Sequence, residues 1–412
     1  MNPLLQRLQP YPFERLRALL ADCSPPESLE PIDLSIGEPK HATPRLLLDA
    51  LAAALPSLSS YPRTAGSDEL RGCIGRWLAR RYGLHRLDPL TQILPVTGSR
   101  EALFAFAQAV LDPRGSPAVV LPNPGYQIYE GAALLAGAEP CFLPLTPETG
   151  FRMQFDRLRP ALWRRVGLVY TCSPGNPTGT VMALDEWRDL FERADRDGFV
   201  IAADECYSEI YPDESCPPLG ALQAAVQLGR PEFDRLLVFG SLSKRSNAPG
   251  LRSGYVAGDA RLIASFLRYR TYHGCAMSPA VQAASIAAWS DEAHVIENRR
   301  RYASKFAEVT SAVASVLPTT VPDAGFYLWA RTPGDDRQYA RRLYEHCGVT
   351  LLPGSFLGRE VEGVNPGCGF VRIALVADET QVREAARRIV ALGSAAPSHP
   401  VGPRGLHPIT EK

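Results

Sequence analysis

Short apolar runs alternate with helix-like stretches between about residues 90 and 260. The runs cover residues 92–97, 118–121, 167–171, 199–203 and 236–240, and helical patterns between them cover 100–111 and 184–197. Strands that are apolar without alternation are typical of a parallel sheet covered on both faces. Their alternation with helices favours right-handed βαβ crossovers. We therefore predict a large α/β domain over residues 46–289, with a mainly parallel sheet flanked by helices.

The pattern changes after residue 290. A long helix is predicted over 291–317, followed by strands at 325–331 and 369–375 and helices at 337–347 and 379–392. Together with residues 1–45, residues 290–392 are predicted to form a smaller α+β domain. Residues 393–412 contain four prolines and three glycines, a composition that predicts a flexible tail.

Composition narrows the possible functions. The 44 Lys+Arg balance the 44 Asp+Glu, so nothing favours a nucleic-acid or membrane partner. The first thirty residues lack the apolar core of a signal peptide, and no apolar run approaches the roughly 18 residues of a membrane span. The nine cysteines include no C-x-x-C pair, which argues against a disulfide framework and a zinc knuckle. We expect a soluble, cytoplasmic protein without a metal site.

Four common motifs are absent from the chain: G-x-x-x-x-G-K-[ST], G-x-G-x-x-G, H-E-x-x-H and G-x-S-x-G. Polar clusters instead follow four of the predicted strands. These clusters are Gly98-Ser99-Arg100, Ser-Pro-Gly-Asn-Pro-Thr-Gly over 173–179, Asp204-Glu205-Cys206-Tyr207 and Ser241-Leu242-Ser243-Lys244. Because ligands bind beyond the carboxyl ends of parallel strands, the fold should gather Asn176, Asp204, Tyr207 and Lys244 in one crevice.

Lys244 is the most informative of the four lysines in the chain. Partial desolvation would lower its pKa and make it a better amine nucleophile, although a lysine in a loop is often only a surface charge. Ser241, Ser243 and Arg252 surround it with donors suited to a phosphate. An amine beside a phosphate cradle is what pyridoxal phosphate requires. By contrast, Lys305 lies in a charged helix and is expected to be solvated.

The other candidates each have two interpretations. The Gly98–Arg100 turn precedes a helix, so it is either an anion site or an ordinary capped turn. Asp204 follows an apolar strand, where it would be the partner of a protonated pyridine nitrogen or a helix N-cap. Tyr207, three residues further on, either shares that site or packs in the core.

Taken together, these motifs resemble the class I/II aminotransferases, which are pyridoxal-phosphate enzymes of fold type I. The resemblance rests on residues 173–179, 204–207 and 241–244, and on Gly-Leu-Arg-Ser-Gly-Tyr over 250–255. The eight-residue step from Lys244 to Arg252 also matches. The resemblance extends to about residue 392.

The resemblance implies a role for each matched residue. Lys244 would form the Schiff base with the cofactor, Asp204 would pair with the pyridine nitrogen, and Asn176 and Tyr207 would bond the ring's 3-oxygen. The cofactor phosphate would be held by Gly98, Ser99, Arg100, Ser241, Ser243 and Arg252. Tyr126 would stack on the ring, and Tyr61 would reach the phosphate of a neighbouring subunit, which implies a homodimer. Arg372 would clamp the substrate α-carboxylate, with a backbone contact from Gly37.

A narrower set of stretches resembles one branch of this family, the bacterial N-succinyldiaminopimelate aminotransferases. These stretches are residues 8–17, 37–41, 126–133, 243–247 and 269–277. The branch implies transamination between N-succinyl-LL-2,6-diaminopimelate and 2-oxoglutarate, giving N-succinyl-2-amino-6-oxopimelate and glutamate, in lysine synthesis. Gly125 and Gly240 depart from the pattern, because an aromatic residue and a histidine are expected there.

Both substrates would carry a distal acidic group, so a second cation is expected near the site. Lys40, Arg245, Arg270 and His273 are candidates by position. Three alternatives remain open: another amino donor such as aspartate or alanine, a carbon–sulfur lyase, and a cofactor-binding regulator. A regulator would need a DNA-binding domain, for which the segment before the α/β unit is too short.

Overall fold

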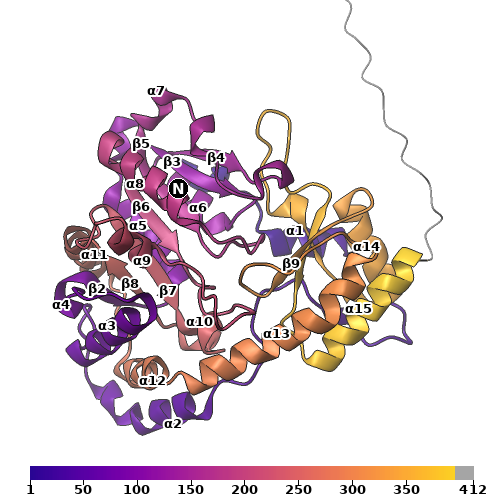
Figure 1. Cartoon of the computed structure of the whole chain (residues 1–412), viewed down its shortest axis with the longest axis horizontal. Helices are drawn as coiled ribbons and strands as arrows, with labels where there is room; N and C mark the ends of the chain where they lie inside the picture. The colour runs from indigo at the N-terminus through magenta and orange to yellow at the C-terminus, as the bar shows by residue number, and fades with distance from the viewer. Residues whose placement is uncertain (395–412) are drawn as a thin grey trace, which may run out of the picture.

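The computed structural model describes residues 1–394. Its centre is a seven-stranded sheet in the order β2-β8-β7-β6-β5-β3-β4 (Figure 1). The strands are β2 Ile93–Val96, β3 Ala118–Asn123, β4 Glu139–Pro144, β5 Val166–Cys172, β6 Val200–Asp204, β7 Leu236–Ser241 and β8 Gly254–Gly258. Only β8 opposes the others, since β2 and β7 are both antiparallel to it and the remaining pairs are parallel.

All five predicted strands of this sheet are confirmed, within a residue or two at each end. The prediction missed β4 and β8. β4 lies at the sheet edge and contains Pro140 and Pro144, residues that lack the N–H needed in a central strand. β8 is only five residues long and both its ends are glycine, a residue that does not indicate a strand.

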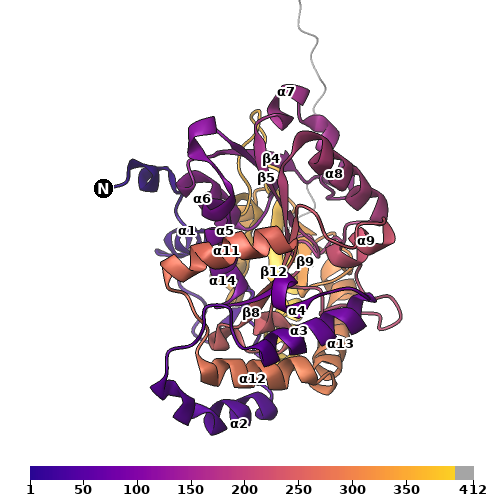
Figure 2. The same cartoon turned by 90° about the vertical axis from the view of Figure 1, so that its left-hand side faces the viewer.

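Helices cover both faces of the sheet. On one face α5 Ser99–Val110, α6 Gln127–Leu135 and α11 Ala260–His273 enclose a core (Figure 2). On the other face lie α3 Asp68–Tyr82, α8 Leu184–Asp197, α9 Ala221–Gln227 and α12 Pro279–Ser290. Alternate residues of each strand enter opposite cores, as Ile93 and Leu94 do in β2. This two-sided burial explains why the strands read as unbroken apolar runs.

The remainder of the described chain builds a second assembly. Its strands are β1 Ile32–Asp33, β9 Tyr327–Arg331, β10 Val349–Thr350, β11 Leu352–Pro353 and β12 Phe370–Ala374, which form an antiparallel β11-β12-β9 sheet and a parallel β1-β10 pair. Its helices are α1 Pro12–Leu19, α13 Ala293–Ala314, α14 Asp336–Cys347 and α15 Glu379–Ser394. Figure 1 shows α13 running from α12 toward α14 and α15. The two-domain boundaries given above stay a prediction. Residues 393 and 394 of the predicted tail belong to α15, and the rest of that tail lies outside the described residues.

Local signals set several helix ends. The Ser67 hydroxyl accepts a hydrogen bond from the Leu70 N–H at the start of α3, and Gly83 ends it with a φ of 66°, a left-handed conformation that favours glycine. Asp335 and Gly348 bound α14 in the same way. The remaining α-helices are α2 Arg45–Ala53, α4 Pro89–Gln92, α7 Pro160–Trp163 and α10 Leu242–Arg245.

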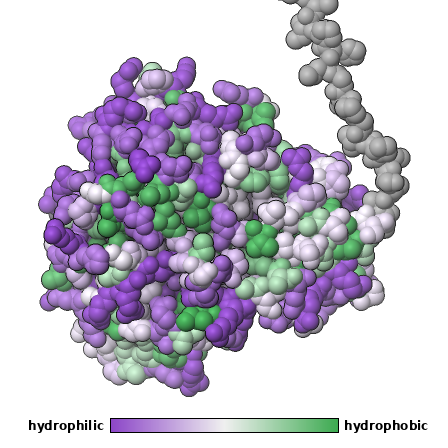
Figure 3. Space-filling model, viewed as in Figure 1, coloured by the Kyte–Doolittle hydropathy of each residue, from purple (hydrophilic) through white to green (hydrophobic). Residues whose placement is uncertain are grey.

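The surface is mixed in polarity. Hydrophilic residues dominate the face seen in Figure 3, and hydrophobic residues form separate patches between them. Within residues 1–394, the helices are too short or too polar for any of them to cross a bilayer.

A buried glutamate links three of these elements. Glu205, at the end of β6, is 2% exposed and accepts hydrogen bonds from the Tyr82 hydroxyl on α3 (3.0 Å) and from the Ala221 N–H at the start of α9. Burial raises the pKa of its carboxyl from an ordinary 4.5 to about 7. The protonated carboxyl therefore contributes stability that is fully present below about pH 4.5 and is lost as the pH rises through about 7.

We expect Glu205→Gln to weaken the pH dependence of the unfolding free energy, because the amide keeps the shape of the side chain and cannot ionise. Between pH 4.5 and pH 8 the variant should gain on the order of 2–3 kcal/mol in unfolding free energy relative to the wild type. Urea unfolding at several pH values measures the difference. Glu192→Gln, at an exposed position of α8, is the matched control. An equal difference at every pH would contradict the prediction.

Candidate active site

The loops beyond the carboxyl ends of the parallel strands open onto a cleft of about 540 Å³. Twelve predicted site residues line it: Gly37, Ser99, Arg100, Tyr126, Asn176, Asp204, Tyr207, Ser241, Ser243, Lys244, Arg252 and Arg372. Gly98, a further predicted site residue, directly precedes Ser99, the first residue of α5. Tyr61 is fully exposed and does not line this cleft.

Lys244 lies on the short helix α10, directly after β7. The Ser241 hydroxyl caps this turn by accepting a hydrogen bond from the Ser243 N–H (2.9 Å). The Lys244 amine donates to the carbonyl of Gly37 and forms no ion pair within residues 1–394. Burial lowers the pKa of this amine to about 8. About a tenth of Lys244 is therefore the neutral, nucleophilic amine at pH 7, far more than for an ordinary lysine.

Asp204 ends β6 and is 4% exposed. Its carboxylate accepts hydrogen bonds from the Tyr129 hydroxyl (2.6 Å) and the Cys206 N–H (3.1 Å). Burial raises the pKa of the carboxyl, and it forms no ion pair in the described part of the chain. A buried carboxylate that faces the cleft and has no cationic partner among residues 1–394 can accept a protonated ring nitrogen.

Asn176 and Tyr207 line the same cleft as this carboxylate and Arg372. The Tyr207 hydroxyl is 2.9 Å from the Tyr327 hydroxyl, and the Asn176 side-chain oxygen accepts from Arg372 Nη1 (2.9 Å). This leaves the Asn176 amide N–H groups free to donate into the cleft. Both side chains are placed where they could bond an oxygen on a ring next to Asp204.

Donors for an anion meet at the start of α5. Gly98 has a φ of 94°, and a Cβ built on it would lie 2.3 Å from Arg252 Nη2, so only glycine admits the guanidinium so close to the helix N-terminus. Arg252 donates to the Pro249 carbonyl (2.9 Å) and has no carboxylate partner within the described residues. Ser99, Ser241 and Ser243 add donors to the same wall. A phosphate suits this cradle.

Arg372 is another cation of the cleft that has no acidic partner among residues 1–394. It lies on β12, is 3% exposed, and donates to Asn176 and to the Ser35 carbonyl (2.8 Å). Its guanidinium lies over the Tyr327 ring at 4.3 Å, and its Nε is buried without a hydrogen-bond acceptor among residues 1–394. A carboxylate would satisfy this group in a bidentate manner. Gly37 borders the same space, where a Cβ would lie 1.7 Å from the Tyr327 hydroxyl oxygen.

The structure also explains the two departures noted in the sequence. A Cβ on Gly125 would lie 2.4 Å from the Pro122 carbonyl oxygen, so no side chain fits there. A Cβ on Gly240 would lie 2.4 Å from the Tyr255 ring, so this tyrosine fills the space of a larger residue.

Two of the four candidates for a second cation are excluded by their surroundings. Arg245 is buried against Trp77 and Trp289 and pairs with Glu292. Arg270 is fully buried and pairs with Glu101 (2.7 Å). Both guanidinium groups are therefore neutralised inside the protein, away from the cleft.

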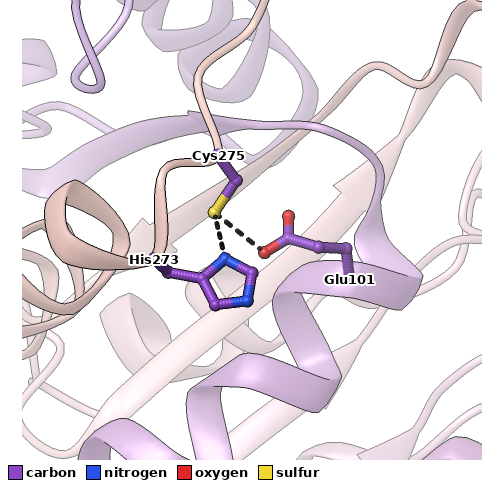
Figure 4. A group of neighbouring side chains, drawn as sticks. All are labelled: Glu101, His273 and Cys275. Atoms are coloured by element: carbon purple, nitrogen blue, oxygen red, sulfur yellow. Dashed lines mark hydrogen bonds between the residues drawn. The ribbon is translucent and has the colours of Figure 1, made fainter.

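The other two candidates lie outside the cleft wall. His273 belongs to a separate cluster, in which its Nδ1 is 3.0 Å from the sulfur of Cys275, and this sulfur is 3.4 Å from a carboxylate oxygen of Glu101 (Figure 4). Arg270 already pairs with that carboxylate, so hydrogen bonds and an ion pair account for the cluster. Lys40 is exposed and pairs with Glu38 (3.1 Å).

The expectation that Lys305 is solvated was wrong. Its side chain is 1% exposed, and its amine donates to His41 Nε2 (2.7 Å) and to the Leu375 carbonyl (3.2 Å). Burial lowers the pKa of Lys305 to about 8. The charged pattern of α13 concealed this contact, because His41 lies 264 residues away in the sequence.

Sequence reasoning also missed three tyrosines of the site. Tyr129 bonds Asp204, Tyr327 bonds Tyr207, and Tyr11 lines the cleft beside Arg100. Tyr11 and Tyr129 lie in stretches that carried the narrower resemblance, but neither sequence position showed what its hydroxyl contacts.

The fold and the cleft are those of a fold-type I pyridoxal-phosphate enzyme. Residues 30–389 match the family model described as aminotransferase class I and II, so the chain belongs to this family. Members of the family use pyridoxal 5′-phosphate. The unpaired Asp204 carboxylate, the Lys244 amine and the donors beside Gly98 fit that group.

Similar proteins include solved structures and curated relatives. An aminotransferase from Neisseria meningitidis superposes with a TM-score of 0.92 at 54% identity, covering 95% of this chain and 100% of that one. A probable N-succinyldiaminopimelate aminotransferase from Thermus thermophilus gives a TM-score of 0.80 at 27% identity, with coverages of 92% and 98%. An LL-diaminopimelate aminotransferase from Nitratidesulfovibrio vulgaris is 31% identical over 395 residues, which cover 94% of this chain and 98% of the relative.

Proposed function

We propose that this enzyme is a succinyldiaminopimelate transaminase, which moves an amino group from N-succinyl-LL-2,6-diaminopimelate to 2-oxoglutarate and so acts in lysine synthesis. The narrower sequence resemblance and the name of the Thermus thermophilus structure support this donor. The Nitratidesulfovibrio vulgaris relative is named for unmodified LL-diaminopimelate, which is therefore the second candidate donor. Both donors share a seven-carbon backbone with a carboxylate at each end.

One observation carries the assignment of the site. Lys244, Asp204 and Arg372 line one cleft, are each at least partly buried, and form no ion pair within residues 1–394. Burying charged groups without partners is costly, so the site is built for a ligand that brings the missing charges. A pyridinium nitrogen would face Asp204, and an α-carboxylate would face Arg372.

In this proposal, different residues of the chain bind the phosphate, the ring oxygen and the ring face of the cofactor. Ser99, Ser241, Ser243 and Arg252, with the backbone of Gly98 and Arg100, bind the phosphate. Asn176 and Tyr207 bond the ring oxygen, Tyr126 stacks on the ring, and Lys244 forms the covalent link. When bound, pyridoxal phosphate supplies an aldehyde that bonds amino groups and a ring that accepts the electrons released at the substrate α-carbon.

The catalytic residues are proposed to be Lys244, Asp204 and Tyr207. Arg372, Asn176 and Gly37 orient the substrate so that its α-hydrogen faces the Lys244 amine. This amine, with a pKa of about 8, then takes the α-proton as a general base and returns it. Asp204 holds a proton on the ring nitrogen, and Tyr207 fixes the ring oxygen.

A second copy of the chain is proposed to complete the site through Tyr61. Four large apolar side chains are exposed together on α2 and the residues after it: Leu48, Leu55, Leu58 and Tyr61. An apolar patch of this kind indicates a protein interface. The family's members are typically homodimers.

The test of the proposed function is a half-reaction without acceptor. Protein loaded with pyridoxal phosphate is mixed with N-succinyl-LL-diaminopimelate, and the bound cofactor is expected to convert to its pyridoxamine form, with one keto acid released per site. Absorbance and chromatography follow the two products. LL-diaminopimelate, glutamate, aspartate and alanine are run in parallel.

If only LL-diaminopimelate converts the bound cofactor to its pyridoxamine form, the enzyme is still a transaminase, but its amino donor is LL-diaminopimelate and not the N-succinyl compound. A β-thioether amino acid is added as a further substrate, and release of a thiol, ammonia and pyruvate from it would identify a carbon–sulfur lyase. A protein that binds the cofactor and converts no amino acid would favour the regulator alternative, which a gel shift with random DNA then tests.

A further inference from the structure

The cleft is lined by more cations than the proposed function uses. Within the described chain, its lining includes Arg100, Lys244, Arg252 and Arg372. Lys244 is the reacting amine, Arg252 serves the phosphate and Arg372 serves the α-carboxylate. Arg100 contributes its backbone N–H to the phosphate cradle, and this leaves its guanidinium without an assigned ligand.

The guanidinium of Arg100 is held between two tyrosines. Its Nε donates to the Tyr126 hydroxyl (2.6 Å) and its Nη2 to the Tyr11 hydroxyl (3.4 Å), and it lies 5.8 Å from the centre of each ring. It forms no ion pair with a carboxylate of residues 1–394. Two hydroxyls from distant parts of the chain thus fix its direction while leaving its charge unpaired.

The position of Arg100 in its helix also favours the binding of an anion beside its guanidinium. It is the second residue of α5, where the positive end of the helix dipole disfavours a cation and favours an anion. A positive side chain at this end is destabilising unless an anion binds near it. The cofactor phosphate assigned to this turn supplies one such anion, and a carboxylate at the Arg100 guanidinium would add a second.

Apolar side chains also line the cleft. Phe13, Ile36 and Leu357 contribute to its wall. A wall of this kind suits the methylene groups of a ligand and disfavours polar groups in its middle. The ligand that fits is an acid at both ends with an aliphatic chain between them.

We propose that Arg100, oriented by Tyr11 and Tyr126, binds the distal carboxylate of the dicarboxylic substrates and so determines specificity. The inference rests on the proposed function, because it takes Arg372 as the partner of the α-carboxylate. A planar guanidinium binds a carboxylate through two parallel hydrogen bonds. Arg100 thus replaces Lys40, Arg245, Arg270 and His273 as the second cation of the site.

The first test measures binding to the cofactor-loaded protein without any reaction. Pimelate and heptanoate both have seven carbons, but only pimelate has a second carboxylate. Titration calorimetry should show that Arg100→Gln weakens pimelate binding about 10- to 100-fold, the cost of one charged hydrogen-bonded pair. Heptanoate binding should change less than about twofold, and Arg100→Lys should lie between the wild type and Arg100→Gln for pimelate.

The second test separates specificity from cofactor binding. In Arg100→Gln, the KM for 2-oxoglutarate should rise by a similar factor while kcat stays within about threefold. The KM for alanine, which has no distal carboxylate, and the Kd for pyridoxal phosphate should change by smaller factors than the KM for 2-oxoglutarate. Arg188→Gln, which removes an exposed cation of α8 outside the cleft lining, is the matched control and should behave as the wild type.

Unchanged pimelate affinity in Arg100→Gln would overturn the proposal. An equal loss for pimelate and heptanoate, or a matching loss of cofactor affinity, would place Arg100 at the phosphate and overturn it as well. These outcomes do not depend on which amino donor the wild type uses, so a failed half-reaction with N-succinyl-LL-diaminopimelate leaves this test intact.

Discussion

Lys244→Ala is expected to lower kcat for transamination by at least about 10³-fold, because it removes the general base. The substitution also removes the covalent link to the cofactor. The phosphate cradle of Arg252, Ser241 and Ser243 is untouched, so the variant should still bind pyridoxal phosphate without a covalent bond. Borohydride reduction followed by mass spectrometry should label Lys244 in the wild type and leave the variant unlabelled.

Lys305→Met is the matched control for this experiment. Lys305 is buried and has a pKa lowered to about 8, as Lys244 does, but its amine faces His41 and Leu375. Lys305→Met should therefore retain the label on Lys244. Label on any other lysine, or a Lys244→Ala protein with more than a tenth of the wild-type rate, would contradict the assignment.

The sequence predicted the central sheet well because its strands bury both faces. Residues 199–203, for example, alternate between two cores in the folded protein, and each core demands an apolar side chain. Helix α8 was predicted at its observed ends for a related reason: its apolar face repeats at helical spacing, and Gly198 ends it in a left-handed conformation. β8 gave no such signal, since its direction and pairing are set by β2 and β7, which lie far apart in the chain.

Charged residues were harder to interpret than apolar ones. Arg245 and Lys305 both looked like ligand-binding or solvated charges, but each is buried against a partner that only the fold supplies. Glu292 lies 47 residues from Arg245, and His41 lies 264 residues from Lys305. A charged side chain is buried only when it is paired or hydrogen-bonded, so its environment cannot be inferred from its neighbours in sequence.

The same reasoning explains why the second cation was missed. Arg100 was assigned to the phosphate from the Gly-Ser-Arg motif, which concerns its backbone. The direction of its side chain depends on Tyr11, 89 residues away, and on Tyr126, 26 residues away. Motifs therefore located the residues proposed to hold the cofactor, whereas the side-chain contacts behind the proposed role of Arg100 became visible only in three dimensions.

Asp204→Asn is expected to lower kcat by about 10²- to 10³-fold, the usual cost of losing one preorganised electrostatic group. Asparagine keeps the shape of the side chain and its oxygen can still accept the hydrogen bond from Tyr129. What it removes is the negative charge that holds a proton on the cofactor's ring nitrogen. Steady-state kinetics at saturating substrate measures the loss, and the Kd for pyridoxal phosphate should rise at the same time.

Although Asp204→Asn is expected to impair catalysis, it should increase the thermal stability of the apoprotein. Without cofactor, the Asp204 carboxylate is buried without a cation, and burial raises its pKa, so the ionised form destabilises the fold at neutral pH. Asp204→Asn should therefore raise the Tm of the apoprotein and narrow the gap between apo and cofactor-loaded Tm. Tyr129→Phe is the control, because it keeps the carboxylate and removes only a hydrogen bond of 2.6 Å. An Asp204→Asn apoprotein with a lowered Tm would mean that the carboxylate is a structural group, because removing a buried charge increases stability only where the fold leaves that charge uncompensated.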